Sequence, residues 1–104
     1  YWGDITGQLK VFIDRCTPYC NTNPARVPVA SRAKGVAIAV RAGKNPKENL
    51  NLVGTIGHFL DHLDIPLLAH FTAEGINAEE DLRMRPEVLK DAYAFGESLF
   101  RSLA

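Results

Sequence analysis

Two short apolar runs, set between three helical patterns, constrain this fold more than any other feature. The first run, Val36–Val40, has Gly35 before it and Gly43 after it, which predicts a strand buried on both faces of a sheet. The second run, Pro66–Phe71, predicts another strand with its proline at the first position. Helix, strand, helix, strand, helix is the order that produces parallel strands joined by crossover helices, so we expect an α/β fold.

Helix-start signals accompany the first two amphipathic stretches. Ile5–Cys16 has apolar side chains at helical spacing, and Asp4 or Thr6 is its candidate N-cap. Asn45 is followed by a proline and then, at the third position, by an acid, which predicts the start of a second helix. This helix should end near Asp64, because the proline shortly beyond cannot continue it.

A third helix should begin at Pro86, and Asn77 with Glu80 predicts one capped helical turn before it. Apolar residues at a 3.6-residue period predict the face that packs on the sheet: Leu89, Ala92, Tyr93, Gly96, Leu99, Phe100 and Leu103. Phe95 faces away from this stripe and indicates a partner surface.

Two strands are too few for the sheet that three such helices would cover. An average sheet has about five or six strands. We therefore expect this chain to be the carboxyl-terminal portion of a larger domain, or to take strands from another chain. The segment Thr17–Gly35 is polar and proline-broken over about 19 residues, which is typical of a functional or interface loop.

Charge and hydropathy exclude several classes of partner. Lysine and arginine number 12 and are balanced by 12 acidic residues, so no basic stripe suits nucleic acid or an anionic membrane. No apolar run approaches the roughly 18 residues of a membrane span. We expect no nucleic-acid partner, no membrane partner and a cytoplasmic location.

The cysteines and histidines do not form a metal-binding pattern. Cys16 and Cys20 are fewer than the ligands of a structural zinc site or iron–sulfur cluster, so we expect reduced thiols packed on the apolar stripe of the first helix, and no metal. His58 and His62 lie one helical turn apart on the second helix, opposite its predicted core stripe, which predicts a solvated face. That core stripe consists of Leu52, Val53, Ile56, Phe59, Leu60 and Leu63.

Three stretches fall where open parallel sheets bind ligands, beyond the carboxyl ends of the strands. The first joins aromatic surface, a glycine and free N–H groups at a helix start, which suits a flat electron-rich ligand. The second places a glycine and two cations after a buried strand, within reach of a ring edge or a cofactor phosphate. The third, Thr72–Ile76, carries no catalytic pattern. The candidate binding residues of the first two stretches are Tyr1, Trp2, Gly3, Asp4, Ile5, Thr6, Arg41, Ala42, Gly43 and Lys44.

The first fifteen residues carry a family resemblance. They read YWGDITGQLKVFIDR, with a leading tyrosine followed at a fixed distance by Leu-Lys-x-Phe-Ile-Asp-Arg. This segment is similar to the corresponding part of the flavodoxin-like NAD(P)H-dependent FMN reductases, a group that includes multimeric flavodoxins and iron–sulfur flavoproteins. The later order of strands, loops and helices is similar as well, so the resemblance covers the whole chain.

The resemblance implies a flavodoxin-like three-layer sandwich with a parallel sheet, of which this chain would be the carboxyl-terminal portion of a single domain. FMN would lie at the strand ends, beside Tyr1–Thr6 and Arg41–Lys44. The implied reaction is hydride transfer from NAD(P)H through the flavin to a quinone-like or other small-molecule acceptor. The resemblance also implies a homodimer or homotetramer, and it assigns no catalytic residue.

Two other functions stay open. A one-electron flavodoxin carrier would share the fold, although such a carrier would be more acidic than this neutral chain. A non-catalytic fragment or interaction module that folds only on oligomerisation is favoured by the shortage of strands.

Overall fold

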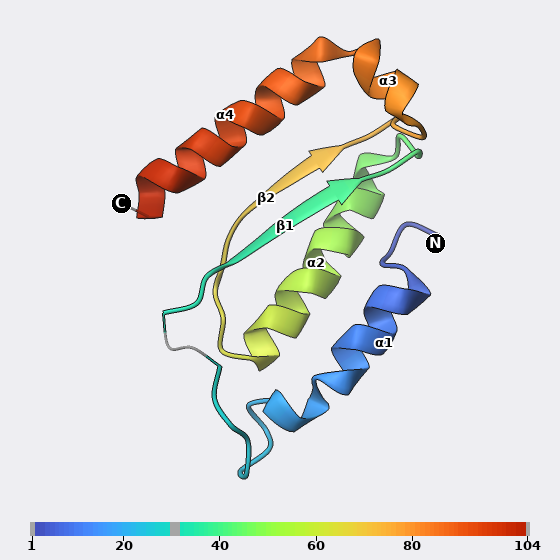
Figure 1. Ribbon diagram of the computed structural model, residues 1–104. Helices are drawn as coiled ribbons and strands as arrows, with labels where there is room; N and C mark the ends of the chain where they lie inside the picture. Colours follow the sequence, from blue (N-terminus) through green and yellow to red (C-terminus); the bar gives the residue numbers. More distant parts are fainter. Residues whose placement is uncertain (1, 30–31, 104) are drawn as a thin grey trace.

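Residues 2–29 and 32–103 are described in a computed structural model of the chain (Figure 1). The elements in chain order are α1 (Gly7–Arg15), the short 3₁₀ helix η1 (Thr17–Tyr19), β1 (Gly35–Val40), α2 (Pro46–His62), β2 (Leu67–Ala73), α3 (Glu79–Arg83) and α4 (Pro86–Leu103). Both predicted strands and all three predicted long helices are therefore confirmed, and the chain is of α/β class. Tyr1, a candidate binding residue, lies outside the described residues.

Predicted N-cap residues begin both α1 and α2. The hydroxyl of Thr6 accepts the Leu9 N–H at 3.1 Å, which makes Thr6 the N-cap of α1. The side chain of Asn45 accepts the Lys47 N–H at 3.0 Å and starts α2. These local hydrogen bonds satisfy amide groups that the first helical turn leaves without a partner.

The turn before α4 is capped by a different acid from the one expected. The carboxylate of Asp81 accepts the N–H groups of Asn77 and Ala78, at 2.8 and 3.0 Å. The expected pairing of Asn77 with Glu80 is therefore wrong by one residue, because α3 begins at Glu79 and places Asp81 at its third position. These two hydrogen bonds from backbone N–H groups hold the pKa of Asp81 below its usual range.

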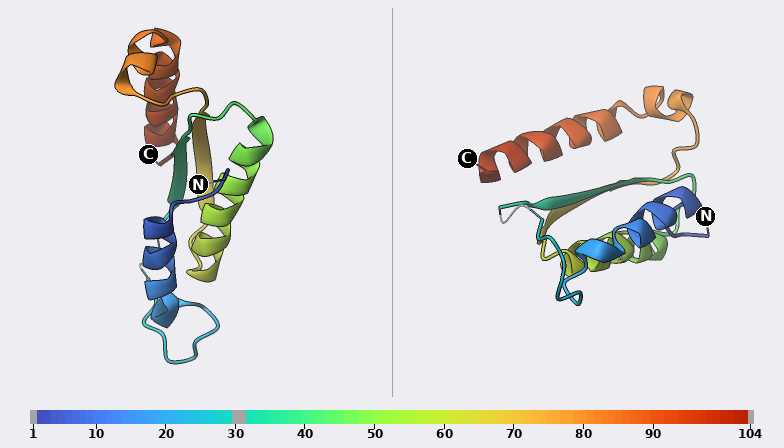
Figure 2. Two further views of the ribbon diagram at one scale, coloured as in Figure 1. Left: turned by 90° about the vertical axis from the view of Figure 1, so that its right-hand side faces the viewer. Right: turned by 60° about the horizontal axis from the view of Figure 1, so that its bottom comes forward.

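The two strands form a parallel sheet that lies between helices. Val36 pairs with Ala69, and the register continues to Val40 and Ala73 after an irregularity beside Gly35. Helix α4 lies on one face of the sheet, and α2 with α1 lies on the other (Figure 2). Within the described ranges, β1 pairs with β2 alone and its second edge has no neighbour.

Small residues of β1 let α2 approach the sheet closely. Gly35, Ala37 and Ala39 alternate along the strand, and all three are buried. A Cβ at Gly35 would overlap the Leu60 Cδ1 of α2. This face of β1 is therefore filled by the helix and not by large side chains of its own.

The opposite face of β1 contradicts the expectation of a strand buried on both sides. Val36, Ile38 and Val40 are 37%, 64% and 57% exposed. Paired residues of parallel strands point to the same face, so Ile38 shares its face with Phe71 of β2. Helix α4 packs on the β2 half of that face and leaves the β1 half open, which is why the row is exposed.

The sheet-facing side of α4 also differs from the predicted stripe. Val88 is buried, and the Phe95 ring lies 5.6 Å from the Phe71 ring. Leu89 and Tyr93, both on the predicted stripe, are 54% and 75% exposed. Helix α4 carries two neighbouring apolar stripes, and its periodicity does not distinguish which of them meets the sheet.

The chain exposes more surface than a compact chain of its size. Its accessible surface is 7635 Å², whereas a folded monomer of 11.5 kDa exposes about 5,800 Å². The radius of gyration is 15.5 Å, above the roughly 13 Å of a compact domain of this length. The excess of about 1,800 Å² is larger than the roughly 800 Å² that one partner contributes to a standard interface.

Replacing Gly35 by alanine should destabilise the chain by about 1–3 kcal/mol, because the added methyl group overlaps Leu60 and forces α2 away from β1. Gly54 is the matched control: it lies in α2 with open space around it. Gly54→Ala should stabilise by up to about 1 kcal/mol through helix propensity. Urea unfolding followed by circular dichroism measures both, and equal effects would contradict close packing at Gly35.

Candidate functional site

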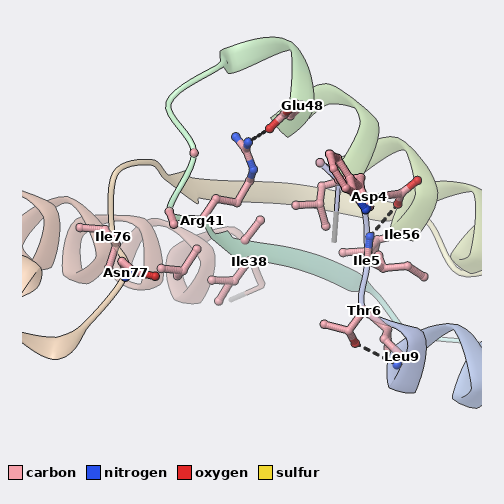
Figure 3. A pocket seen from close by; sticks show the side chains of 17 residues that line it. Asp4, Ile5, Thr6, Leu9, Ile38, Arg41, Glu48, Ile56, Ile76 and Asn77 are labelled. Atoms are coloured by element: carbon pink, nitrogen blue, oxygen red, sulfur yellow. Dashed lines mark hydrogen bonds and ion pairs between the residues drawn. The ribbon is translucent and has the colours of Figure 1, made fainter.

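A cavity of about 740 Å³ lies at the carboxyl end of β1, between α1, α2 and the segment that precedes α1 (Figure 3). Its volume is in the range of about 300–1,000 Å³ that small-molecule sites occupy. The residues that line it are Trp2, Gly3, Asp4, Ile5, Thr6, Leu9, Ile38, Ala39, Val40, Arg41, Ala42, Gly43, Glu48, Leu52, Ile56, Ile76 and Asn77.

Two stretches far apart in sequence meet in this cavity, as their positions at the strand ends suggested. The described part of the first stretch, residues 2–6, contributes every residue, and the second contributes Arg41, Ala42 and Gly43. Lys44 does not line the cavity; its side chain lies against Gly75 instead.

Sequence reasoning missed the apolar walls of the cavity. Leu52 and Ile56 of α2 were assigned to the core stripe, and Ile38 to a strand buried on both faces. All three line the cavity and are not fully buried. The helical spacing of Leu52 and Ile56 was the available signal, but periodicity does not distinguish the wall of a cavity from a packed core.

The segment before α1 is fixed to α2 by one carboxylate. Asp4 Oδ1 accepts the hydroxyl of Thr55 at 2.9 Å and the N–H of Ile5 at 2.7 Å. Thr6 then caps α1. The segment therefore crosses from α2 to α1 along the cavity wall (Figure 3).

A left-handed turn places Trp2 at the cavity. Trp2 and Gly3 have φ values of 53° and 73°. A Cβ at Gly3 would lie 2.6 Å from Cγ of Glu48, so the backbone approaches α2 as only glycine permits. The Trp2 side chain is fully exposed, which leaves its indole face free for a ligand.

Arg41 is buried and bonded within the protein. Its Nη1 donates to the Asn49 side chain at 2.7 Å and to the Asn45 carbonyl at 3.1 Å, and its Nη2 donates to Glu48. Asn49 in turn donates to Glu74, beyond β2. The guanidinium thus joins the end of β1, the first turns of α2 and the β2 loop, and its charge is balanced by Glu48.

Backbone hydrogen bonds hold the two strand-end loops side by side. The Ile76 N–H donates to the Arg41 carbonyl at 2.8 Å, and the Gly75 N–H donates to the Gly43 carbonyl at 3.2 Å. A Cβ at Gly43 would lie 2.7 Å from Nη2 of Arg41, so a side chain there would press on the guanidinium. The floor of the cavity is therefore fixed before any ligand arrives.

The side chains that line the cavity suit the binding of a ligand. The titratable side chains of the lining are Asp4, Arg41 and Glu48, and each is bonded to another group of the protein. Most of the other lining residues are aliphatic. Such a cavity fits a flat, largely apolar ligand oriented by a few polar groups.

Two further properties concern the described residues only. No group of three or more His, Cys, Asp or Glu is placed to hold a metal ion there. None of the helices in that part of the chain has the length and apolarity to cross a membrane. Comparisons with protein-family models, curated proteins and solved structures found no match to this chain.

Glu48→Ala should lower the free energy of unfolding by about 1–3 kcal/mol, because it leaves the buried Arg41 guanidinium without its carboxylate. Glu97 pairs with Arg101 on the exposed surface of α4 and is the matched control. Glu97→Ala should change stability by at most about 0.5 kcal/mol. Urea unfolding measures both variants, and equal losses would contradict a special role for the Arg41 pair.

Proposed function

We propose that this chain forms the flavin-binding part of an FMN-dependent NAD(P)H oxidoreductase. The observation that carries the proposal is the cavity at the end of β1, where residues 2–6 meet the loop that follows the strand. These are the two stretches that the family resemblance assigns to FMN. Ligands of open parallel sheets bind beyond the carboxyl ends of the strands, where this cavity lies.

The residues present fit the ring part of a flavin. Leu52 and Ile56 offer aliphatic walls, and Trp2 offers an exposed aromatic face at the same cavity. Residues 3–6 line the same cavity, and we expect their backbone to supply polar groups to the edge of the ring. Together they would hold a planar ring by stacking and apolar contact, with backbone groups fixing its orientation.

The described residues of the lining provide no free cation for a phosphate. Arg41 is the one cationic side chain among the described lining residues, and it is bonded to Glu48 and Asn49. We propose that groups outside this chain hold the FMN phosphate.

The chemistry of the proposed reaction belongs to the cofactor. FMN, when bound, accepts a hydride from NAD(P)H and passes reducing equivalents to a small acceptor such as a quinone. The chain's own residues bind and orient: Asp4 fixes the segment beside the ring, and the Arg41 network keeps the strand-end loop in place. The aliphatic walls would limit the access of water to a bound ring.

The finer fold is part of this proposal. Further parallel strands on the open edge of β1, with the crossover helices that join them, would complete a flavodoxin-like three-layer sandwich, and such a helix would cover Val36, Ile38 and Val40. A homodimer or homotetramer would be the form in which the site is used.

Flavin titration of the purified chain tests the proposal. The fluorescence of riboflavin and of FMN should be quenched on binding. Their dissociation constants should agree within about threefold, because Arg41 is already neutralised and the phosphate of FMN gains no cation in the cavity. Trp2→Ala should weaken binding about threefold to tenfold through lost stacking. Tyr93→Ala removes another exposed aromatic ring, outside the cavity, and should leave flavin binding unchanged.

The outcomes separate the two parts of the proposal. Equal binding by the Trp2 and Tyr93 variants, or no flavin binding at all, would contradict the cavity as a flavin site. Flavin binding without oxidation of added NADH or NADPH would contradict the oxidoreductase and favour a one-electron carrier.

A second candidate function rests on a separate observation. The open edge of β1, its exposed row Val36, Ile38 and Val40, and the excess accessible surface favour an interaction module that is completed by another polypeptide. An edge strand with a flat apolar face is a template for further strand pairing.

Val36→Lys should shift the solution mass toward a monomer, because the charge would be buried wherever a partner covers β1. Val36 does not line the cavity, so flavin binding is read separately. Leu50→Lys, at an exposed position of α2, is the matched control and should leave the mass unchanged. Analytical ultracentrifugation measures both; a wild-type monomer at all concentrations would exclude self-association.

A further inference from the structure

A second cluster of reactive groups lies at the far end of α2 from the cavity, where η1 and the end of α2 come together (Figure 1). The Cys20 sulfur lies 3.3 Å from Nδ1 of His62 and 3.2 Å from the hydroxyl of Thr22. A thiol within hydrogen-bond reach of an imidazole is the arrangement of an activated nucleophile. No residue of this cluster lines the cavity.

The position of Cys20 differs from the sequence prediction. Cys16 and Cys20 were expected on one apolar stripe of the first helix. Instead α1 ends at Arg15, η1 intervenes, and Cys20 follows it in an extended conformation. The sulfur of Cys20 therefore turns from α1 toward His62, which was expected on a solvated face but is half-buried here.

The loop around Cys20 is fixed by hydrogen bonds that do not involve the sulfur. The Asn21 N–H donates to the His62 carbonyl at 2.7 Å, and its side-chain amide donates to Asp64 at 3.1 Å. Arg26 pairs with the same carboxylate at 2.7 Å. The Asn21 and Arg26 contacts hold the pKa of Asp64 below its usual range. The thiol and imidazole are thus brought together by a clamp that would survive a change at either one.

Hydrogen bonds favour the ionised form of the thiol. The side chain and then the backbone of Thr22, followed by His62, lower the pKa of Cys20 from 9.0 to about 7, against the opposing effect of burial. The ring of His58 lies 4.6 Å from that of His62, and Asp64 and Arg26 are the remaining charged groups of the clamp. A substantial fraction of the sulfur is therefore thiolate at neutral pH.

We propose that Cys20 is a nucleophilic thiol site, with His62 as its proton acceptor, that reacts with small hydroperoxides. The thiolate sulfur attacks one oxygen of the peroxide, so that an S–O bond forms and the O–O bond breaks. The sulfur loses two electrons and becomes a sulfenic acid. The leaving oxygen takes up a proton, which the His62 imidazolium supplies, and departs as water or an alcohol.

The half-buried position of Cys20 favours a small oxidant over a large electrophile. The Thr22 hydroxyl lies at the sulfur, where it can donate a hydrogen bond to the departing oxygen. Cys20 and His62 lie outside the cavity, so the reactivity of this thiol does not depend on flavin binding.

The pH dependence of alkylation tests the activated thiol. In a Cys16→Ser background, the rate of iodoacetamide labelling at Cys20 should rise with a midpoint at pH about 7. His62→Gln should raise that midpoint and slow labelling at pH 7 by about twofold, since the loss of thiolate is partly offset by the higher nucleophilicity of a more basic sulfur. Thr22→Val should also raise the midpoint, and this variant provides the test if His62→Gln does not fold.

His70→Gln is the matched control, because His70 is an exposed histidine of β2 that does not contact Cys20. It should leave the midpoint unchanged. A midpoint that stays at pH about 7 in the folded His62 and Thr22 variants, or that shifts equally with His70→Gln, would overturn the assignment.

Oxidation of the full chain tests the reaction itself. After brief treatment with hydrogen peroxide, a dimedone adduct located by mass spectrometry should be at least about tenfold more abundant at Cys20 than at Cys16. Both cysteines are half-buried, so exposure alone does not account for such a difference. Equal adducts, or more at Cys16, would overturn the proposal.

Discussion

The buried guanidinium of Arg41 is the constraint on which the rest of this structure depends. A buried charge without partners is costly, and the start of α2 supplies three: Asn45, Glu48 and Asn49. These bonds set where α2 begins relative to the end of β1. Because Gly3 packs on Glu48, the same network also places the segment that forms the cavity wall.

The two faces of β1 differ in what they bury. One face carries Gly35, Ala37 and Ala39, which let α2 lie close to the strand. Two strands with one close helix bury little apolar area, and the large side chains of β1 remain on the open face. Further burial on that face would add the apolar stabilisation that this arrangement lacks.

Local signals were readable from the sequence, and long-range partners were not. Asn45 was predicted as a cap, and Thr6 as one of two candidates beside Asp4, because a cap and its helix lie within a few residues. The cavity was anticipated at the strand ends, because parallel topology places loops there whatever their composition. The pairing of Arg41 with Glu48 and the contact of Cys20 with His62 join different elements, so composition and periodicity gave no sign of either.

The polarity of α2 accounts for the different chemistry at its two ends. A helix N-terminus favours negative charge, and Glu48 lies in the first turn of α2, where it also balances Arg41. A helix C-terminus favours positive charge, and His62 lies in the last turn. One helix therefore orders a binding cavity at its start and supports a reactive thiol at its end.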